Sequence, residues 1–337
     1  MGVGDRRVGI GLIGAGGIGR LHAQHLTSRV PGARLVAVAD VDGKAAASCA
    51  EEHQVPSVYE DVRDLLADRA VDAVVICSPP DTHARIIEEA AARGKHIFCE
   101  KPIDCDLAKI DRALAAVARA GVKLQVGFNR RFDENFRYVR EAVASGRVGE
   151  PRMLHIVSRD PRLPSPSQTQ ATAGLFLDMT IHDFDMARYL LASEVAEVYA
   201  LAQSTAGRAD PDTALITMRF ASGAMGTIDN GQTVYGYDQR VEVFGSEGSV
   251  RVDNEQPHRA SIVDGSGTHG ALPLHFFVER YAPSYIAELI AFTDCILRDT
   301  EPPVTGHDGR MAVVLALAAQ RSLEEKRPVA PKELSDD

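Results

Sequence analysis

The sequence has no long apolar run, no excess of basic residues and no hydrophobic leader. No stretch approaches the roughly 18 consecutive apolar residues that a membrane-spanning helix needs, and residues 1–7 are too short and polar to be a signal peptide. The 37 basic and 47 acidic residues give a formal charge of −10. A nucleic-acid-binding protein would normally present a basic field. We therefore expect neither a membrane nor a nucleic acid among the partners.

Cysteine is also scarce. The sequence contains Cys49, Cys77, Cys99, Cys105 and Cys295. This number is odd and no Cys-x-x-Cys spacing occurs, so the cysteines predict neither a disulfide framework nor a zinc site. We interpret them as reduced thiols of a cytoplasmic protein, and we expect no metal ion.

Length and composition are those of an ordinary globular protein with more than one domain. The chain has 337 residues, of which 45% are hydrophobic and 25% charged. A single hydrophobic core usually stops growing below this length. We expect a first domain at residues 1–128 and a second at residues 129–337.

The first motif is a glycine-rich turn between a strand and a helix. Apolar residues 8–13 run into Gly14-Ala15-Gly16-Gly17-Ile18-Gly19, and helix-forming residues follow. In a dinucleotide site Gly14 permits the tight turn, Gly16 lets the backbone approach a pyrophosphate, and Gly19 lets the helix pack on the strand. We expect Gly14, Gly16, Gly17, Ile18 and Gly19 to contact the cofactor.

A carboxylate follows at the spacing that such a site requires. Residues 34–39 predict a second strand that ends at Asp40, 21 residues after Gly19. There the Asp40 carboxylate would meet the ribose hydroxyls of NAD and repel the additional phosphate of NADP. The pattern therefore predicts NAD as the cofactor.

Apolar strands continue to alternate with helices up to residue 128. This alternation predicts an α/β fold with a doubly wound parallel Rossmann sheet and helices on both faces. Ligands of such sheets bind beyond the carboxyl ends of the strands. We therefore expect the cofactor to contact Ser78, Pro79, His83, Glu100 and Lys101. Lys101 is also placed to stabilise a substrate oxygen, although a surface ion pair with Glu100 is an alternative role.

The pattern changes after residue 133. Successive β-like runs between residues 196 and 252, separated by turn residues, predict an antiparallel meander. The Pro-, Ser- and Thr-rich stretch 161–173 is too long for a simple connection, and we interpret it as a lid. Tyr235 and Tyr237 alternate along an extended segment, so we expect them to share one face and Asp238 to point away.

A helical segment near residue 180 carries groups suited to proton transfer. At helical period Asp178, His182 and Asp185 fall on one face. A histidine beside a carboxylate is a candidate acid or base, held in one tautomer by its neighbour. Surface electrostatics or a buried structural histidine is the alternative interpretation.

Several motifs together resemble a known family. In chain order the sequence contains Gly14-Ala15-Gly16-Gly17-Ile18-Gly19, Asp40, Glu100-Lys101-Pro102, residues 127–133 (GFNRRFD) and Asp178-x-x-x-His182-Asp183. This set resembles the Gfo/Idh/MocA oxidoreductases over nearly the whole chain. Longer strings at residues 158–161, 176–188, 235–239 and 275–281 resemble the inositol 2-dehydrogenases of this family.

The resemblance implies a fold and an activity. It implies an NAD-binding Rossmann domain followed by an α/β domain with an open, mostly antiparallel sheet, and a homodimer or homotetramer. Lys101, Asp178 and His182 correspond by position to the family's catalytic set. The implied reaction is NAD-dependent oxidation of a cyclic polyol, myo-inositol, to 2-keto-myo-inositol (scyllo-inosose).

The substrate-binding residues are less sharply defined. Arg130, Asp160, Tyr235 and Tyr237 are candidates for binding the other ring hydroxyls, with packing or solvation as the alternative. Residues 171–174 (ATAG) depart from the expected Ser-Gly-Gly, which leaves the substrate's identity open. Another inositol isomer, an aldose, a redox glycosidase that regenerates NAD, and a non-catalytic NAD-sensing regulator are the alternatives.

Overall fold

The computed structural model describes residues 6–161, 174–204, 211–233 and 235–334. The chain divides into two compact units, Met1–Asn129 with Pro283–Met311, and Arg130–Ala282 with Ala312–Asp337. The division expected from the sequence had assigned all of residues 283–311 to the second domain. The interpretation of 161–173 as a lid falls on residues outside the described part, apart from Pro161.

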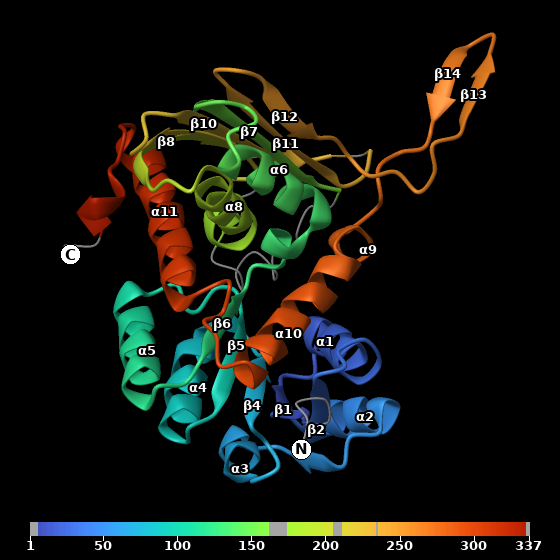
Figure 1. The fold of residues 1–337 in the computed structure, drawn as a ribbon, viewed down its shortest axis with the longest axis vertical. Helices are drawn as coiled ribbons and strands as arrows, with labels where there is room; N and C mark the ends of the chain where they lie inside the picture. Colours follow the sequence, from blue (N-terminus) through green and yellow to red (C-terminus); the bar gives the residue numbers. More distant parts are fainter. Residues whose placement is uncertain (1–5, 162–173, 205–210, 234, 335–337) are drawn as a thin grey trace. The chain divides into compact units, whose positions relative to one another are not determined.

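The first unit is built on a six-stranded sheet in the order β3-β2-β1-β4-β5-β6 (Figure 1). Every neighbouring pair in it is parallel, so the Rossmann prediction is confirmed. The strands are β1 (Val8–Ile13), β2 (Ala33–Ala39), β3 (Ser57–Tyr59), β4 (Ala73–Ile76), β5 (His96–Glu100) and β6 (Leu124–Gly127).

Helices cover both faces of this sheet. One face packs against α1, α2 and α10 through a single apolar cluster that includes Leu26, Cys49, Leu289 and Phe292. The other face carries α3, α4 and α5, which contact one another in that order. The helices are α1 (Gly17–Ser28), α2 (Gly43–His53), α3 (Val62–Ala67), α4 (Pro80–Ala92), α5 (Leu107–Ala120) and α10 (Ala282–Leu297).

Aspartates begin several of these helices. The Asp42 carboxylate accepts hydrogen bonds from the Lys44 and Ala45 amides at the start of α2, and Asp106 caps α5 in the same way. Such caps satisfy amides that have no partner within the helix. Gly121 ends α5 in a left-handed conformation with φ 65°, which glycine adopts without steric cost.

The second unit contains a six-stranded sheet in the order β12-β11-β7-β10-β9-β8. All neighbouring pairs are antiparallel except β7 with β10, so the expectation of a mostly antiparallel sheet is confirmed. The expectation of a simple meander is wrong, because β7 lies between β10 and β11. The strands are β7 (Pro151–Asp160), β8 (Val195–Gln203), β9 (Thr213–Phe220), β10 (Met225–Gln232), β11 (Asp238–Gly245) and β12 (Ser249–Val252).

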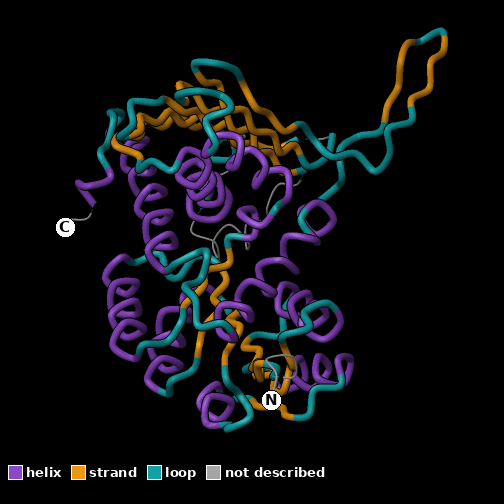
Figure 2. The backbone as a smooth tube through the Cα atoms, in the orientation of Figure 1, coloured by secondary structure: helices purple, strands orange, loops and turns teal. Residues whose placement is uncertain are grey.

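Helices of this unit pack on one face of its sheet, and a hairpin extends from it. The hairpin of β13 (Ser261–Asp264) and β14 (Gly267–Gly270) is exposed throughout and projects from the sheet (Figure 2). The helical elements are α6 (Glu134–Ala144), η2 (Phe176–Thr180), α8 (Ile181–Leu191), α9 (Phe277–Arg280), most of α11 (Gly306–Glu325) and η3 (Pro331–Leu334). The short helix η1 (Asn129–Phe132) lies where the chain leaves the first unit.

Candidate active site

The glycine-rich turn between β1 and α1 has two kinds of glycine. Gly14 has φ 97°, and a Cβ there would lie 2.6 Å from the carbonyl carbon of Cys77. A Cβ on Gly19 would lie 1.9 Å from the Gly14 oxygen, so both positions require glycine for packing. At Gly16 and Gly17, by contrast, a Cβ would meet no described atom within 4 Å. These two glycines keep the start of α1 open, as a bound pyrophosphate requires.

Asp40 fixes this turn from the end of β2. One carboxylate oxygen accepts a hydrogen bond from the Ala15 amide at 2.7 Å, and the other accepts one from the Asp42 amide at 2.9 Å. Each carboxylate oxygen has a further lone pair. Asp40 is therefore held beside the glycine turn and can still accept from ribose hydroxyls.

A pocket adjoining Asp40 in the chain was not foreseen from the sequence. Val41, directly after Asp40, is 92% exposed although it is apolar. Single exposed apolar residues are common, so the sequence offered no signal at this position. The pocket is lined by Val41, Glu60, Asp61, Val62, Arg63 and Arg85.

The loops after β4 and β5 are joined by His83. Its buried ring lies 2.7 Å from the Pro102 carbonyl oxygen through Nδ1 and 2.7 Å from the Ser78 carbonyl oxygen through Nε2. Both ring nitrogens thus have protein partners, and the observed role of His83 is to connect these two loops. Pro79 is exposed, and Lys101, half-buried, follows β5 with a cis bond to Pro102.

In the second unit, Asp178 and His182 lie on a helix that changes its pitch. Residues 176–180 form a π-helical turn, η2, which continues directly into α8. The Asp178 amide donates to the Gly174 oxygen at 3.1 Å. Both Asp178 and His182 are half-buried. Single π-helical turns occur frequently at functional sites, and reading the segment at α-helical period alone did not predict this one.

The neighbouring acidic residues of α8 are structural. Asp183 is fully buried and accepts from Arg130 at 2.6 Å and from the Asn230 side-chain amide at 2.8 Å. Burial raises the pKa of Asp183, and the Arg130 charge opposes that rise. Asp185, expected to share a face with His182, is buried and receives two hydrogen bonds from Arg131, at 2.6 and 2.8 Å.

Arg130 and Tyr237, two of the four residues expected to bind the substrate, are both buried and contact one another. Arg130, 5% exposed, also bonds the Tyr237 hydroxyl at 3.4 Å and lies over the Tyr281 ring. Burial raises the pKa of the Tyr237 hydroxyl well above its usual range, and the nearby Asp160 adds to this rise. The structure therefore brings Arg130 and Tyr237 together, and Arg130 is also paired with Asp183.

The Tyr235 side chain contacts Asp238 and Arg159. Its hydroxyl donates to Asp238 at 3.0 Å, and Arg159 donates to it at 3.0 Å. Tyr235 is 38% exposed whereas Tyr237 is 6% exposed. The expectation that the two tyrosines share a face away from Asp238 is therefore wrong. Gly236, with φ 112°, interrupts the extended alternation on which that expectation depended.

Comparison with known proteins gives matches along both units. The family model described as "Oxidoreductase family, NAD-binding Rossmann fold" matches residues 8–128, and the GFO/IDH/MocA C-terminal domain model matches residues 136–251. The family match, together with the fold and the glycine turn, defines the class of protein as an NAD-binding oxidoreductase. The chain belongs to the Gfo/Idh/MocA family.

Named relatives cover almost the full chain. An uncharacterized oxidoreductase of Bacillus subtilis is 47% identical over 96% of this chain and 97% of its own. Myo-inositol 2-dehydrogenase of Thermotoga maritima is 45% identical over 96% of this chain and 99% of its own. The crystal structure of scyllo-inositol dehydrogenase from Lactobacillus casei, with bound NAD(H) and scyllo-inositol, matches with TM-score 0.90 and 29% identity over 97% of this chain and 100% of its own.

Proposed function

We propose that this protein oxidises myo-inositol to 2-keto-myo-inositol with NAD. The observation that carries the proposal is the 45% identity, over nearly the full length of both chains, to a protein named myo-inositol 2-dehydrogenase. The open start of α1 and the placement of Asp40 fit the cofactor. Scyllo-inositol is the second candidate substrate, because the Lactobacillus casei relative is named for it and binds it.

In the proposed reaction His182 removes the proton of the reacting hydroxyl. A neutral imidazole is suited to accept a proton in this step. Asp178, at the preceding π-helical turn, holds one of the two reacting side chains, Lys101 or His182, in place. Bound NAD supplies the acceptor for the hydride that leaves the same carbon.

Lys101 acts on the oxygen from which His182 takes the proton. Negative charge develops on this oxygen as the proton leaves, and a lysine ammonium stabilises that charge more strongly in the transition state than in the ground state. Lys101 follows directly after Glu100, the last residue of β5, where a Rossmann sheet binds its ligands. We assign it the role of electrostatic stabiliser.

Recognition of the remaining ring hydroxyls is assigned to Asp160 and Tyr237, with Tyr235 and Arg130 in supporting roles. Asp160 is half-buried at the end of β7, and its main-chain oxygen accepts from the Thr233 amide at 2.9 Å. Carboxylate and phenol oxygens bind the hydroxyls of a polyol well. Arg130, engaged by Asp183 and Tyr237, orients the tyrosine.

We also propose that the protein is a homotetramer or homodimer formed through the sheet of the second unit. Large apolar side chains are exposed on its strands, each 48–53% accessible: Leu201, Leu215, Met225 and Phe244. Leu201 and Leu215 are direct cross-strand neighbours. Exposed apolar patches on a sheet indicate an interface, and sedimentation equilibrium would measure the assembly. No helix within the described ranges is long and apolar enough to cross a membrane; a cytoplasmic location stays a prediction.

The proposal is tested by following NADH absorbance with purified protein, NAD and a panel of substrates. The panel contains myo-inositol, scyllo-inositol, other inositol isomers, glucose and an aryl glycoside. We expect the highest kcat/KM with myo-inositol. A higher kcat/KM with scyllo-inositol or an aldose would show that the assignment of myo-inositol as the substrate is wrong. Sugar release from the glycoside without NADH accumulation would replace the proposed function by redox glycoside cleavage.

A further inference from the structure

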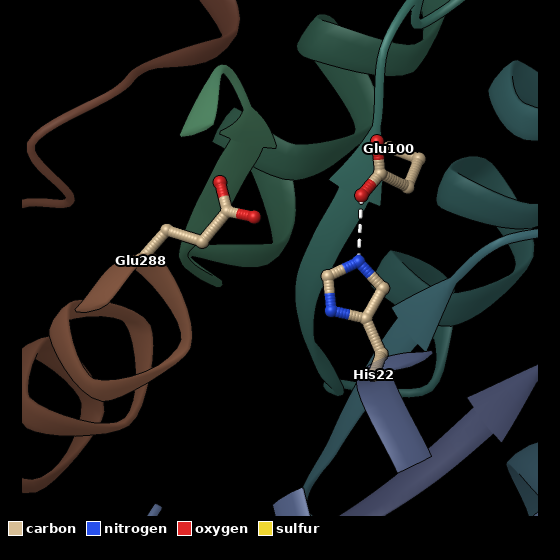
Figure 3. A group of neighbouring side chains, drawn as sticks. All are labelled: His22, Glu100 and Glu288. Atoms are coloured by element: carbon tan, nitrogen blue, oxygen red, sulfur yellow. Dashed lines mark hydrogen bonds and ion pairs between the residues drawn. The ribbon is translucent and has the colours of Figure 1, made fainter. Parts of the chain in front are cut away.

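A buried polar cluster lies in the first unit, and the proposed reaction does not use two of its three residues. His22 from α1, Glu100 from β5 and Glu288 from α10 each contribute one side-chain nitrogen or oxygen atom to a group whose three atoms lie within 4.8 Å of one another. Figure 3 shows the three side chains directed toward one another from these separate elements. His22 and Glu288 are 0% exposed and Glu100 is 9% exposed.

Only one contact within this cluster is a conventional hydrogen bond. His22 Nε2 and Glu100 Oε1 are 2.6 Å apart. Neither carboxylate oxygen of Glu288 has a hydrogen-bond partner among the residues that the structure describes. The Gln125 side chain donates to the main-chain oxygen of Glu288 at 2.8 Å, which fixes α10 but not the carboxylate.

The complete burial of Glu288 disfavours a negative charge on its carboxyl group. Phe98 packs edge-on against His22, with ring centroids 5.5 Å apart, and against Phe292, 5.8 Å apart. An ionised carboxylate without a partner in such an apolar core is very costly, and a buried acid normally binds a proton instead. The titratable groups facing the cluster are His22, Cys77, Cys99, Glu100 and Tyr285, with His25 next to His22.

A metal ion is the other way to neutralise the cluster, and the geometry argues against it. Ligand atoms bonded to zinc at about 2.0–2.1 Å in a tetrahedral site lie about 3.3 Å from one another. The 2.6 Å separation of His22 Nε2 and Glu100 Oε1 is too short for two ligands of one ion but fits a charge-assisted hydrogen bond. A proton therefore satisfies the observed distances better than a metal does.

We propose that Glu288 is a neutral carboxylic acid that directs its proton to Glu100, and that Glu288 and His22 together are positioning residues for the strand end carrying Lys101. Glu100 then accepts from His22 on one side and, through one bridging water across at most 4.8 Å, from Glu288 on the other. On a third side Gly127 of β6 makes room, because a Cβ there would lie 3.1 Å from Glu100 Oε2. Lys101 is the next residue in the chain, so a fixed position of Glu100 also fixes the position of the Lys101 backbone.

The proposal predicts an unusual pH dependence of stability. Burial raises the pKa of Glu288 well above its usual range, and the Glu100 charge adds to this. Since the folded pKa exceeds the unfolded one, the folded state holds a proton that the unfolded state has released. The free energy of unfolding therefore falls as pH rises from the ordinary carboxyl pKa through the raised one. Glu288→Gln removes this fall.

The first arm of the test needs no substrate. We compare the parent with Glu288→Gln and with the control Glu51→Gln, which replaces an exposed carboxyl of α2 in the same unit. We expect the infrared carbonyl band of a protonated carboxyl at neutral pH in the parent and in the control, and its loss in Glu288→Gln. We also expect urea unfolding to show that Glu288→Gln gains stability over the parent as pH rises, whereas the control follows the parent.

The second arm measures turnover and rests on the proposed function. Glutamine keeps a neutral donor toward Glu100, so Glu288→Gln should retain kcat within a few-fold. Glu288→Met deletes the donor and should lower kcat more than it changes the KM for myo-inositol, with NAD still bound. If the parent oxidises no polyol, the proposed function fails while the infrared and unfolding results still decide this inference.

Three outcomes would overturn the inference. The first is a parent spectrum without the protonated-carboxyl band. The second is one divalent metal per chain, found by mass spectrometry in the purified parent and lost in Glu288→Gln. The third is a Glu288→Gln variant that loses kcat as completely as Glu288→Met, since a neutral donor at this position would then be insufficient.

Discussion

At the scale of single residues, Asp40 connects the glycine turn to the choice of cofactor. Its carboxylate already accepts from the Ala15 and Asp42 amides, so its position is fixed before any ligand binds. Rigid placement of a negative charge gives it discriminating power, because a group that can move aside repels weakly. We therefore propose that Asp40 recognises the ribose hydroxyls and rejects a ribose phosphate through the same fixed negative charge.

We predict a kcat/KM with NAD at least roughly tenfold above that with NADP, a difference of about 1.4 kcal/mol. Asp40→Asn keeps an acceptor for the Ala15 amide but deletes the charge, and it should narrow this ratio. The measurement is kcat/KM for both cofactors at saturating polyol. Equal use of NADP by the parent would contradict the assignment and direct attention to Arg63 and Arg85 of the neighbouring pocket.

Residue spacing predicted the cofactor turn but misplaced the tyrosines. Gly14, Gly19 and Asp40 act over short stretches of chain, where local sequence determines geometry. The positions of Tyr235 and Tyr237 depend instead on a positive φ at Gly236 and on Arg130, 107 residues before Tyr237. The alternation of residues along the sequence predicts neither the positive φ of Gly236 nor the contact between Arg130 and Tyr237.

At the scale of secondary-structure elements, the segment from η2 to α8 is held by ion pairs from elsewhere in its unit. Asp183 of α8 pairs with Arg130, and Asn230 of β10 donates to the same carboxylate. Thr180, at the end of η2, donates to Asn230 at 2.5 Å. The contacts of Thr180 and Asp183 thus fix the end of the π-helical turn and the start of α8, and His182 lies between these two residues.

We predict that Asp183→Asn lowers the free energy of unfolding by about 3–5 kcal/mol, the usual cost of leaving one partner of a buried ion pair unmatched. The matched control is Glu197→Gln, which weakens a surface pair with Arg219 at 4.0 Å. It should cost less than about 1 kcal/mol. Urea unfolding monitored by circular dichroism measures both. Equal, small losses would show that Arg130 is compensated by other groups.

The elements themselves were largely predictable, but their order in the second sheet was not. In residues 8–128 the apolar patterns predicted the alternation of strands and helices, because each pattern depends only on residues close together in the sequence. The insertion of β7 between β10 and β11 depends on a parallel pairing across about 70 residues. The π-helical turn at 176–180 was hidden because its composition also suits an α-helix.

At the scale of the whole molecule, the first unit is built from two separate segments of the chain. Residues 283–311 follow the second unit in sequence yet belong to the first, where Leu289 and Phe292 of α10 join the core under the parallel sheet. Apolar periodicity predicted a helix here but carried no information about which unit it covers. This return also brings Glu288 to Glu100 and His22.

The proposed mechanism assigns chemical roles to Lys101 of the first unit and to Asp178 and His182 of the second. In that mechanism Lys101 stabilises the negative charge that develops on the substrate oxygen. Loss of Lys101 should therefore affect the rate of hydride transfer rather than folding or cofactor binding. This expectation separates an electrostatic role in the transition state from simple anchoring of the substrate.

The most direct measurement is the pair of kcat and KM values for myo-inositol in Lys101→Met, which keeps the length of the side chain but deletes its charge and donors. The control is Lys109→Met, which removes a partly exposed lysine of α5 that pairs with Asp104 at 3.5 Å. We predict that Lys101→Met binds NAD but loses kcat by roughly 10²–10³-fold with KM changed only a few-fold, as for loss of transition-state stabilisation, while Lys109→Met behaves like the parent. A raised KM with near-normal kcat would contradict the account, because Lys101 would then only anchor the substrate.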